Sequence, residues 1–342
     1  MLVSQSVSQT GPEAVLSACE PAPGRTGAPP SFPAGGNSAC SSRKNSKARQ
    51  AISVVIPAHN REKTIGRAIQ SVLEQTYPAQ EIIVVDDGSS DNTVQAALAA
   101  CPSCLIVRSS RNQGAQIARS LGIQSSQGQW IALLDSDDHW YKQKLEWQME
   151  KARQGFQVVH GYGSVRTAQG NYEYIPLQSE GNIYPQLLRG PGPLYPTLLV
   201  HRQCFAKSGL PDPAIAAYQE WDFSLSLASH YSFGCVNKPL FVCDTREADS
   251  VFRNNYYRGL RGYEQIVCKW WPEIMTHLGP KAGMAHYRYL ATQALRVSGW
   301  PGFMHYTTLG ARLAGRSRAG RLLYETQRHL FSGVRRMIKR KN

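Results

Sequence analysis

Three carboxylates, Asp135, Asp137 and Asp138, follow directly on the apolar run 131–134. An apolar run without polar alternation is typical of a strand that is buried on both faces of a parallel sheet. Open α/β sheets bind ligands at the carboxyl ends of their strands, and Asp135 and Asp137, two residues apart, can point to the same side. Carboxylates gathered at one point repel one another unless a cation joins them. The spacing therefore predicts a divalent metal with phosphate oxygens as its remaining ligands, and an acidic N-cap of the next helix is the alternative.

Further acids lie elsewhere in the chain. Asp86 and Asp87 follow a second apolar run at 82–85, and Glu220 and Asp222 open a later helical stretch. An ionised carboxylate only accepts hydrogen bonds, so it suits the hydroxyls of a ribose or the N–H of a pyrimidine. Asp, Gly and Ser also form turns, which leaves a plain turn after Asp87 as the alternative. Two Asp-rich ends on neighbouring parallel strands favour a nucleotide site.

The elements that must position these acids alternate between strand and helix. Asn60 and Asp91 are candidate N-caps of the first two helices, since both types accept hydrogen bonds from free backbone N–H groups. The pattern predicts a doubly wound α/β sheet. The expected strands are 52–56, 82–85, 105–107 and 131–134, and the expected helices are 65–73, 94–98 and 114–121.

The pattern changes after Asp138. Loops rich in Gly, Pro and Tyr separate the later elements, and we expect these to extend the same sheet on the side of an acceptor. Residues 251–342 are predicted to form a helical, basic C-terminal extension. The expected later strands are 156–159, 197–200 and 233–243, with a short helix at 220–228 and helical tendency over 255–310.

The two ends of the chain differ from its centre. Residues 1–50 are rich in Ser, Ala, Gly, Pro and Gln with Phe32 as their single aromatic residue, which predicts disorder. The net charge is +14, and residues 311–342 hold ten Lys or Arg against one acid, Glu325. The positive charge is therefore concentrated in a C-terminal tail and does not indicate a nucleic-acid-binding core. Either a membrane-surface helix that contacts anionic lipid or a solvated basic end explains this tail.

Several classes of protein are excluded by what the sequence lacks. No GxGxxG follows the first predicted strand, no GxxxxGK[ST] occurs, and no GxSxG occurs. A dinucleotide-binding fold, a phosphate-loop NTPase and an α/β-hydrolase are therefore poorly supported. No signal peptide and no run of about 18 apolar residues is found, so we expect a cytoplasmic protein with at most a peripheral contact on the inner face of the membrane.

Four segments, taken together, resemble the family 2 glycosyltransferases of the GT-A fold. The resemblance implies a GT-A glycosyltransferase domain over 51–250, with a nucleotide-binding half at 51–140 and an acceptor half at 141–250. It implies a Rossmann-like, mostly parallel sheet. The segments are ISVVIPAHN at 52–60, IVVDDGS at 83–89, NQG with Ala118-Arg119 at 112–119, and DSDD at 135–138.

The resemblance also implies roles for residues of the nucleotide half. Pro57, Ala58 and His59 would line the nucleotide base, and Asp87 would contact uracil or ribose. Asp135 would lie near the ribose. The family commonly has another aromatic residue where His59 stands, and an imidazole can still stack on a base.

Further roles concern the metal and the reaction. Asp137, the last acid of the DXD motif, would be the direct ligand of Mn²⁺ or Mg²⁺. Glu220 is the candidate general base and Asp222 the reserve, although the family usually has Asp at that place. Arg246 and Ser250 roughly match a motif at the rim of the active site.

The implied activity is inverting, metal-dependent transfer of a sugar from a nucleotide-diphosphate sugar, expected to be a UDP-sugar. The acceptor would be a hydroxyl of a glycan, a lipid-linked molecule or another acceptor of polysaccharide biosynthesis at the cell envelope. The Gln-x-x-Arg-Trp motif of processive relatives is absent, which favours a single transfer. A sugar nucleotidyltransferase and a catalytically degenerate sugar-nucleotide-binding protein are the alternatives.

Overall fold

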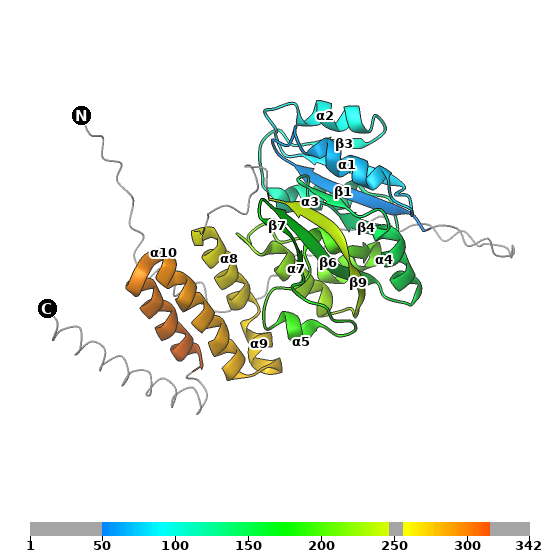
Figure 1. Ribbon diagram of the computed structural model, residues 1–342. Coiled ribbons are helices and arrows are strands. Elements are labelled where there is room, and N and C mark those ends of the chain that lie inside the picture. Colours follow the sequence, from blue (N-terminus) through cyan, green and yellow to red (C-terminus); the bar gives the residue numbers. More distant parts are fainter. Residues whose placement is uncertain (1–49, 246–255, 315–342) are drawn as a thin grey trace, which may run out of the picture. The chain divides into compact units, whose positions relative to one another are not determined.

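The structure is a computed structural model that describes residues 50–245 and 256–314 (Figure 1). Some predictions fall outside these ranges. They are the disordered first segment, the roles of Arg246 and Ser250, and most of the basic tail.

One mixed sheet carries the described elements of the domain. Its strand order is β3-β2-β1-β4-β8-β6-β9-β5, and β7 pairs with β6 outside this path. The strands are β1 (Ile52–Ala58), β2 (Glu81–Asp86), β3 (Leu105–Arg108), β4 (Trp130–Leu133), β5 (Asp138–Trp140), β6 (Val158–Thr167), β7 (Gly170–Tyr174), β8 (Leu199–His201) and β9 (Phe233–Asp244).

Helices cover this sheet and continue beyond it. The helices are α1 (Ile65–Leu73), α2 (Thr93–Ala100), α3 (Ala115–Ser125), α4 (Lys144–Arg153), α5 (Tyr184–Leu187), α6 (Phe205–Ser208), α7 (Gln219–Ala228), α8 (Tyr256–Lys269), α9 (Trp271–His277) and α10 (Pro280–Ala314), with short 3₁₀ turns at Tyr195–Thr197 and Arg202–Cys204.

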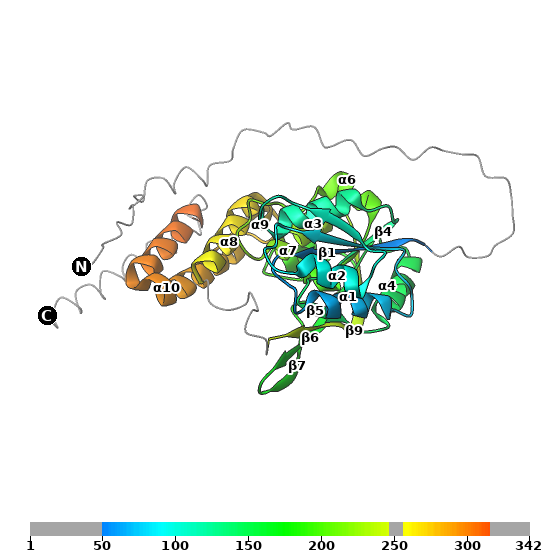
Figure 2. The ribbon, with the colours of Figure 1, turned by 90° about the horizontal axis from the view of Figure 1, so that it is seen from above.

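The two faces of β1 show why the first half is doubly wound. Val54 and Ile56 belong to one hydrophobic cluster with Ile65 of α1, whereas Val55 belongs to another cluster with Ala118 of α3. Successive side chains of a strand point to opposite faces, so a strand with helices on both sides must be apolar throughout. Helices α1 and α3 accordingly lie on opposite sides of β1 (Figure 2). The predicted doubly wound α/β fold is confirmed.

The second half of the sheet is mainly antiparallel. Strands β3, β2, β1 and β4 are parallel neighbours, but β8 is antiparallel to both β4 and β6. β6 and β9 are parallel, and β5 is antiparallel to β9. The sheet is therefore parallel in the nucleotide half and mixed beyond β4.

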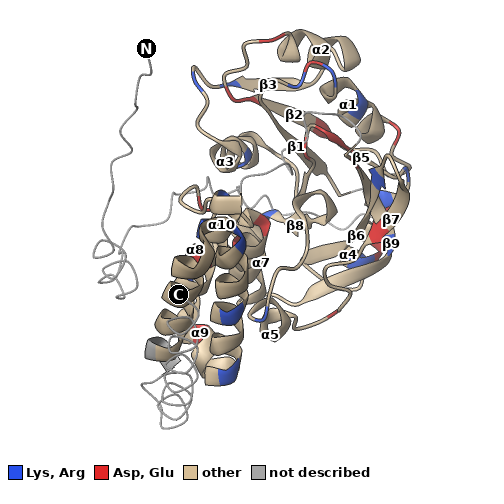
Figure 3. Cartoon of the chain, turned by 60° about the vertical axis from the view of Figure 1, so that its left-hand side comes forward, with Lys and Arg blue, Asp and Glu red and all other residues tan. Residues whose placement is uncertain are grey.

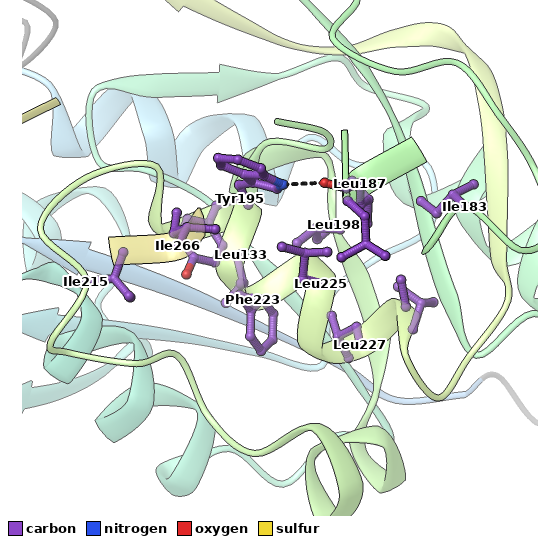
Figure 4. Close-up of a cluster of buried hydrophobic side chains, with 14 of the residues drawn as sticks. Leu133, Ile183, Leu187, Tyr195, Leu198, Ile215, Phe223, Leu225, Leu227 and Ile266 are labelled. Atoms are coloured by element: carbon purple, nitrogen blue, oxygen red, sulfur yellow. Dashed lines mark hydrogen bonds between the residues drawn. The ribbon is translucent and has the colours of Figure 1, made fainter. Parts of the chain in front are cut away.

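Helix α7 is held under the sheet by apolar side chains. Phe223, Leu225 and Leu227 are almost fully buried in one hydrophobic cluster (Figure 4). On the same helix Trp221 donates its indole N–H to the carbonyl oxygen of Leu187 at 2.7 Å. These contacts fix the start of α7, which carries the candidate base.

The C-terminal helices share this cluster. Tyr263 and Ile266 of α8 and Tyr287 of α10 are buried in it. Helix α10 bends at Gly299, whose φ of +66° is in the left-handed region, and Pro301 follows the bend. Helices α8 to α10 are thus packed on the domain by a common apolar core.

Two expectations about local structure are wrong. Asn60 does not cap α1, because that helix begins at Ile65; Asn60 adopts a φ of +53° and its side-chain oxygen accepts the backbone N–H of Ser90 at 2.9 Å. The alternative of an acidic helix cap also fails, because Asp138 begins β5 and pairs with Cys243.

Candidate active site

The acids of the nucleotide half gather at one edge of the sheet. β1 lies between β2 and β4, and Ala58 at the end of β1 is paired with Asp86 at the end of β2. On the other side the backbone N–H of Leu134, which follows β4, donates to the carbonyl oxygen of Val55 at 3.1 Å. The parallel ends therefore bring the two acidic groups to the same edge.

Asp87 organises the loop before α3. Its side chain is buried, and its two carboxylate oxygens accept the backbone N–H groups of Gln113 at 2.9 Å and Gly114 at 2.7 Å. The φ of Gly114 is +96°, a conformation that favours glycine. His59 donates from Nδ1 to the carbonyl oxygen of Asp87 at 2.9 Å, which orients the imidazole beside this loop. A contact between Asp87 and a nucleotide stays a prediction.

The other residues expected to line a base lie on or after β1. Pro57 and Ala58 are buried within the strand, and His59 is half-buried. His59 is thus the best exposed of the three. The structure brings them to the correct edge of the sheet, and their contact with a base also stays a prediction.

Asp135 and Asp137 are accessible and flanked by arginines. Their side chains are 30% and 32% exposed, respectively. Arg119 donates to Asp135 Oδ1 at 2.5 Å, and Arg61 Nη2 lies 3.8 Å from Asp137 Oδ2. Arg67 donates to the backbone carbonyl oxygen of Asp137 at 3.1 Å. The site therefore presents carboxylates to solvent within a rim of positive charge.

The negative charge of this group is only partly offset. Burial raises the pKa of Asp137 and the neighbouring Asp135 raises it further, while Arg61 and Arg119 act in the opposite direction. Burial also raises the pKa of Asp138 well above its usual range, and the charges of Asp135 and Asp137 add to this. A bound cation would stabilise the ionised forms of all three acids.

These acids fit a metal that is shared with substrate. Within residues 50–245 and 256–314 no group of three His, Cys, Asp or Glu side chains could hold a metal ion alone. Mg²⁺ is commonly bound through one or two carboxylates together with substrate phosphates and water. Asp135 and Asp137 match that smaller donor set, and binding of a metal by Asp137 stays a prediction.

Arg119 is a site residue that received no role from the sequence, although it belongs to one of the four segments that carry the resemblance. It is buried, and besides Asp135 it donates to Gln116 Oε1 at 2.8 Å. Its guanidinium carbon lies 4.0 Å from the ring centre of Tyr195, whose hydroxyl accepts the Gln116 amide N–H at 2.8 Å. The signal in the sequence was an arginine on the inner face of α3, next to the buried Ala118.

Glu220 lies on the side of these acids. It is half-buried at the start of α7. Burial raises the pKa of Glu220, the guanidinium of Arg119 lowers it, and the carboxylate of Asp135 raises it. The packing agrees with this. Arg119, which bonds Asp135, lies 4.0 Å from the ring centre of Tyr195. That ring lies 5.9 Å from the ring of Phe223 on α7. Helix α7 therefore begins near the carboxyl end of β4, across about 85 residues of chain.

Asp222, the reserve base, is hydrogen-bonded to residues that follow α7 in the chain. It is buried, and its two oxygens accept hydrogen bonds from Lys269 Nζ and Trp270 Nε1, each at 2.8 Å. Residues two apart on a helix point to different sides. Asp222 thus faces the C-terminal helices, beside which the acidic start of α7 lies in Figure 3. The structure brings Glu220, and not Asp222, toward Asp135.

Helix α8 holds the loop that leads into α7. Gln265 accepts the backbone N–H of Ala216 at 2.9 Å and donates to the carbonyl oxygen of Ala214 at 2.9 Å. Arg258 donates to the carbonyl oxygen of Ala216 at 2.6 Å. Because one helix bonds successive backbone groups, the position of this loop depends on α8.

The helix and the loop approach each other at a glycine. A Cβ atom added to Gly262 would lie 2.4 Å from the backbone nitrogen of Ala217. Tyr218, the next residue, has a φ of +56°, which is uncommon for a residue with a side chain. This strained residue comes directly before α7 and two residues before Glu220. The contact of Ala217 with Gly262 of α8 therefore supports the geometry of the candidate base.

The family model described as glycosyl transferase family 2 matches residues 53–206. This segment of the chain is therefore similar to glycosyl transferase family 2. The match confirms the resemblance, and it includes β1, β2, β4 and the acids at their ends. Glu220 and helices α8 to α10 lie beyond it.

A similar protein from Escherichia coli is named UDP-Glc:alpha-D-GlcNAc-diphosphoundecaprenol beta-1,3-glucosyltransferase WfgD. It is 29% identical over 219 residues, which are 61% of this chain and 82% of the relative. The chain spans only 31–36% of the length of several Rickettsia proteins that it also matches, which are named as uncharacterised glycosyltransferases.

Solved structures confirm the GT-A-like fold. Staphylococcus aureus TarS, residues 1–349 in complex with UDP-GlcNAc, is similar with a TM-score of 0.58 at 15% identity, over 77% of this chain and 81% of that chain. The mannosyltransferase PcManGT from Pyrobaculum calidifontis, in complex with GDP-Man and Mn²⁺, is similar with a TM-score of 0.50 at 17% identity, over 86% of this chain and 89% of that chain.

None of the described helices, within 50–245 and 256–314, meets both the length and the hydrophobicity that a bilayer requires of a spanning helix.

Proposed function

We propose that this chain is an inverting, metal-dependent glycosyltransferase that makes a single transfer from a UDP-sugar to a hydroxyl of a glycan or lipid-linked acceptor. The observation that carries the proposal is the arrangement around Arg119. This buried arginine bonds Asp135, and its charge acts on Glu220 as well. Acids suited to the donor and an acid suited to the acceptor thus share one centre.

The donor would be held at the edge formed by β1, β2 and β4. A UDP-sugar is favoured because TarS was solved with UDP-GlcNAc and the E. coli relative is named for UDP-Glc. The half-buried ring of His59 would stack on the base, and the arginines Arg61 and Arg119 would face the diphosphate. Asp135 would lie near the ribose.

Asp137, with Asp135 beside it, would hold a Mn²⁺ or Mg²⁺ ion together with diphosphate oxygens. PcManGT was solved with Mn²⁺. The pKa of Asp137 is raised by burial and by the charge of Asp135, and such an ion would offset both effects. When bound, the ion would stabilise the charge that develops on the diphosphate as it leaves.

Glu220 would act as the general base. Its carboxylate would take the proton of the acceptor hydroxyl as that oxygen attacks the anomeric carbon from the face opposite the diphosphate. A new C–O bond forms, the bond to the diphosphate breaks, and the configuration inverts. The pKa of Glu220 is raised by burial, which makes the carboxylate a stronger base than an exposed glutamate.

The acceptor and the location are proposed together. The E. coli relative is named for an acceptor that carries a diphosphoundecaprenol lipid. An enzyme that uses such an acceptor must reach the membrane surface, and the basic residues of 311–342 would attract anionic lipids there. We therefore propose a cytoplasmic enzyme with a peripheral contact on the inner face of the membrane.

The decisive test replaces Asp137 with Asn. The change should reduce sugar transfer on the order of 10³-fold, because an amide is a poor ligand for a hard cation. The wild type should be thermally stabilised by UDP with Mn²⁺, and D137N should not. Glu150, an exposed acid on α4, supplies the control, since E150Q should keep both properties.

The fold of the variant can be judged separately. Because the ionised form of Asp137 is disfavoured by burial and by Asp135, an uncharged amide should leave the unfolding temperature without ligand equal or higher. Turnover by D137N at the level of the wild type, with a donor that the wild type uses, would refute the assigned metal role.

A further inference from the structure

Tyrosines from separate elements surround the candidate base. Tyr174 ends the hairpin strand β7, Tyr218 directly precedes α7, and Tyr289 lies on α10. Tyr263 of α8 joins them, with ring centres 5.8 Å from Tyr218 and 4.5 Å from Tyr289. Tyr174 lies within the matched segment 53–206 and the other three tyrosines lie beyond it, so that segment could not form the group alone.

The tyrosines differ in how far they are buried. Tyr263 is buried and its hydroxyl lies 2.9 Å from His286 Nδ1, so this residue is part of the packed core. Tyr174 and Tyr289 are 41% and 39% exposed. The ring of Tyr289, which stands on the buried ring of Tyr263, offers a firm apolar surface to a ligand.

Glu220 lies beside this group, because Tyr218 precedes it by two residues and packs on Tyr263. Burial is the largest cause that raises the pKa of Tyr174, and the carboxylate of Glu220 is the next. Burial also raises the pKa of Tyr218, and Tyr289, Glu220 and Tyr174 add to it in that order. Rings and carboxylate therefore belong to one local group of charges and hydroxyls.

We propose that Tyr174, Tyr218 and Tyr289 form the acceptor subsite, an aromatic platform on which a pyranose ring of the acceptor stacks with one hydroxyl directed at Glu220. The inference rests on the proposed function and specifies its acceptor as a carbohydrate. A pyranose has an apolar face of C–H groups and a polar rim. The apolar face suits the tyrosine rings, and the rim suits the tyrosine hydroxyls and the carboxylate.

The same surface is poorly suited to an alkyl chain. A lipid tail needs continuous apolar contact, and burying it against the charged Glu220 and several phenol groups would leave those groups without water. The fixed position of Tyr218 in this platform also has a structural cause. The strained φ of Tyr218 and the contact of Gly262 with Ala217 hold one ring of the platform at a fixed distance from the base.

The experiment uses the full chain with UDP and Mn²⁺ and a panel of methyl pyranosides as probes: glucoside, galactoside, mannoside and N-acetylglucosaminide. Saturation-transfer NMR reports which sugar protons receive magnetisation from aromatic side chains. We expect transfer to at least one pyranoside, strongest at the C–H groups of one ring face. No transfer to any member of the panel would overturn the proposal.

Substitutions then separate stacking from other roles. Y289A and Y174A should each weaken binding of the pyranoside on the order of tenfold, the loss expected when one ring face is returned to water. Y289F and Y174F should stay within about twofold, because the ring remains. Tyr256, which is 63% exposed at the start of α8, supplies the control Y256A, with unchanged affinity.

The remaining outcomes are equally decisive. Alanine variants that bind as well as the wild type, phenylalanine variants that lose as much as alanine, or binding by octyl but not methyl glycosides would each overturn the platform. Tyr174 lies on an exposed hairpin, so Y174A tests the idea even where Y289A unfolds. UDP affinity, measured in parallel, should not change. Absence of UDP binding by the wild type would instead refute the proposed function.

Discussion

Substitution of Gly262 by alanine should disturb catalysis more than stability. The added Cβ would lie 2.4 Å from the backbone nitrogen and 2.6 Å from the carbonyl oxygen of Ala217, whereas ordinary contacts of this kind begin at 3.4 Å. Helix or loop must therefore separate by about 1 Å, as the difference between 3.4 and 2.4 shows. Ala217 precedes Glu220 by three residues, so this displacement reaches the candidate base.

The expected magnitudes differ for the two properties. Overpacking of this kind costs about 1–3 kcal/mol, and alanine in place of glycine within a helix returns about 1 kcal/mol. The free energy of unfolding should thus fall by only ~0–2 kcal/mol. A catalytic group misplaced by about 1 Å can lose on the order of 10²-fold in rate. Activity should therefore fall much further than stability explains.

The same helix provides a matched control. An added Cβ on Gly259 meets no atom within 4 Å. G259A should raise the free energy of unfolding by about 0.5–1 kcal/mol through the helix alone and leave turnover unchanged.

Two measurements test whether α8 determines the position of the candidate base. Release of UDP under saturating donor gives kcat, and denaturant unfolding gives stability. If G262A matched the wild type in both, α8 would not determine where the base stands, and the link between the C-terminal helices and the active site would be wrong.

The other predictions concern pH and membranes. Because burial and Asp135 raise the pKa of Glu220 above the ordinary 4.5, kcat/KM should decline as pH falls through that raised value, with its acid limb above pH 4.5. R119Q removes the cation that lowers this pKa, so the limb should move to higher pH; a limb at or below 4.5 would contradict the role of Glu220. With vesicles of anionic lipid, the full chain should float and a chain without residues 315–342 should not, and added salt should weaken flotation. Equal flotation of both would show that the basic tail is not the membrane contact.

The nucleotide half could be predicted from the sequence to a large extent. Each apolar run before an acidic group became a buried parallel strand, because a strand covered on both faces must be apolar at every position. Asp91, expected to cap the second helix, lies one residue before the actual N-cap Asn92, and its side chain accepts the backbone N–H of Thr93 at 3.0 Å. The expected cap Asn60 failed, since its side chain is used to join two loops instead.

Tertiary structure alone decided which distant groups meet. The sequence predicts Glu220 as the candidate base and Asp222 as the reserve. In the structure Asp222 is bonded to Lys269 and Trp270 instead. Arg119 had no role assigned from the sequence, yet it bonds Asp135 and its charge also acts on Glu220.

The physical reason is the range over which each kind of information acts. Hydrophobic periodicity and turn chemistry are local, so the chain by itself determined the strands, the helices and the acids at the strand ends. The partner of a buried charge depends on which helix packs on which loop across many tens of residues. That choice is made by the shape of the shared apolar core, where α7, α8 and α10 meet, and no short segment contains it.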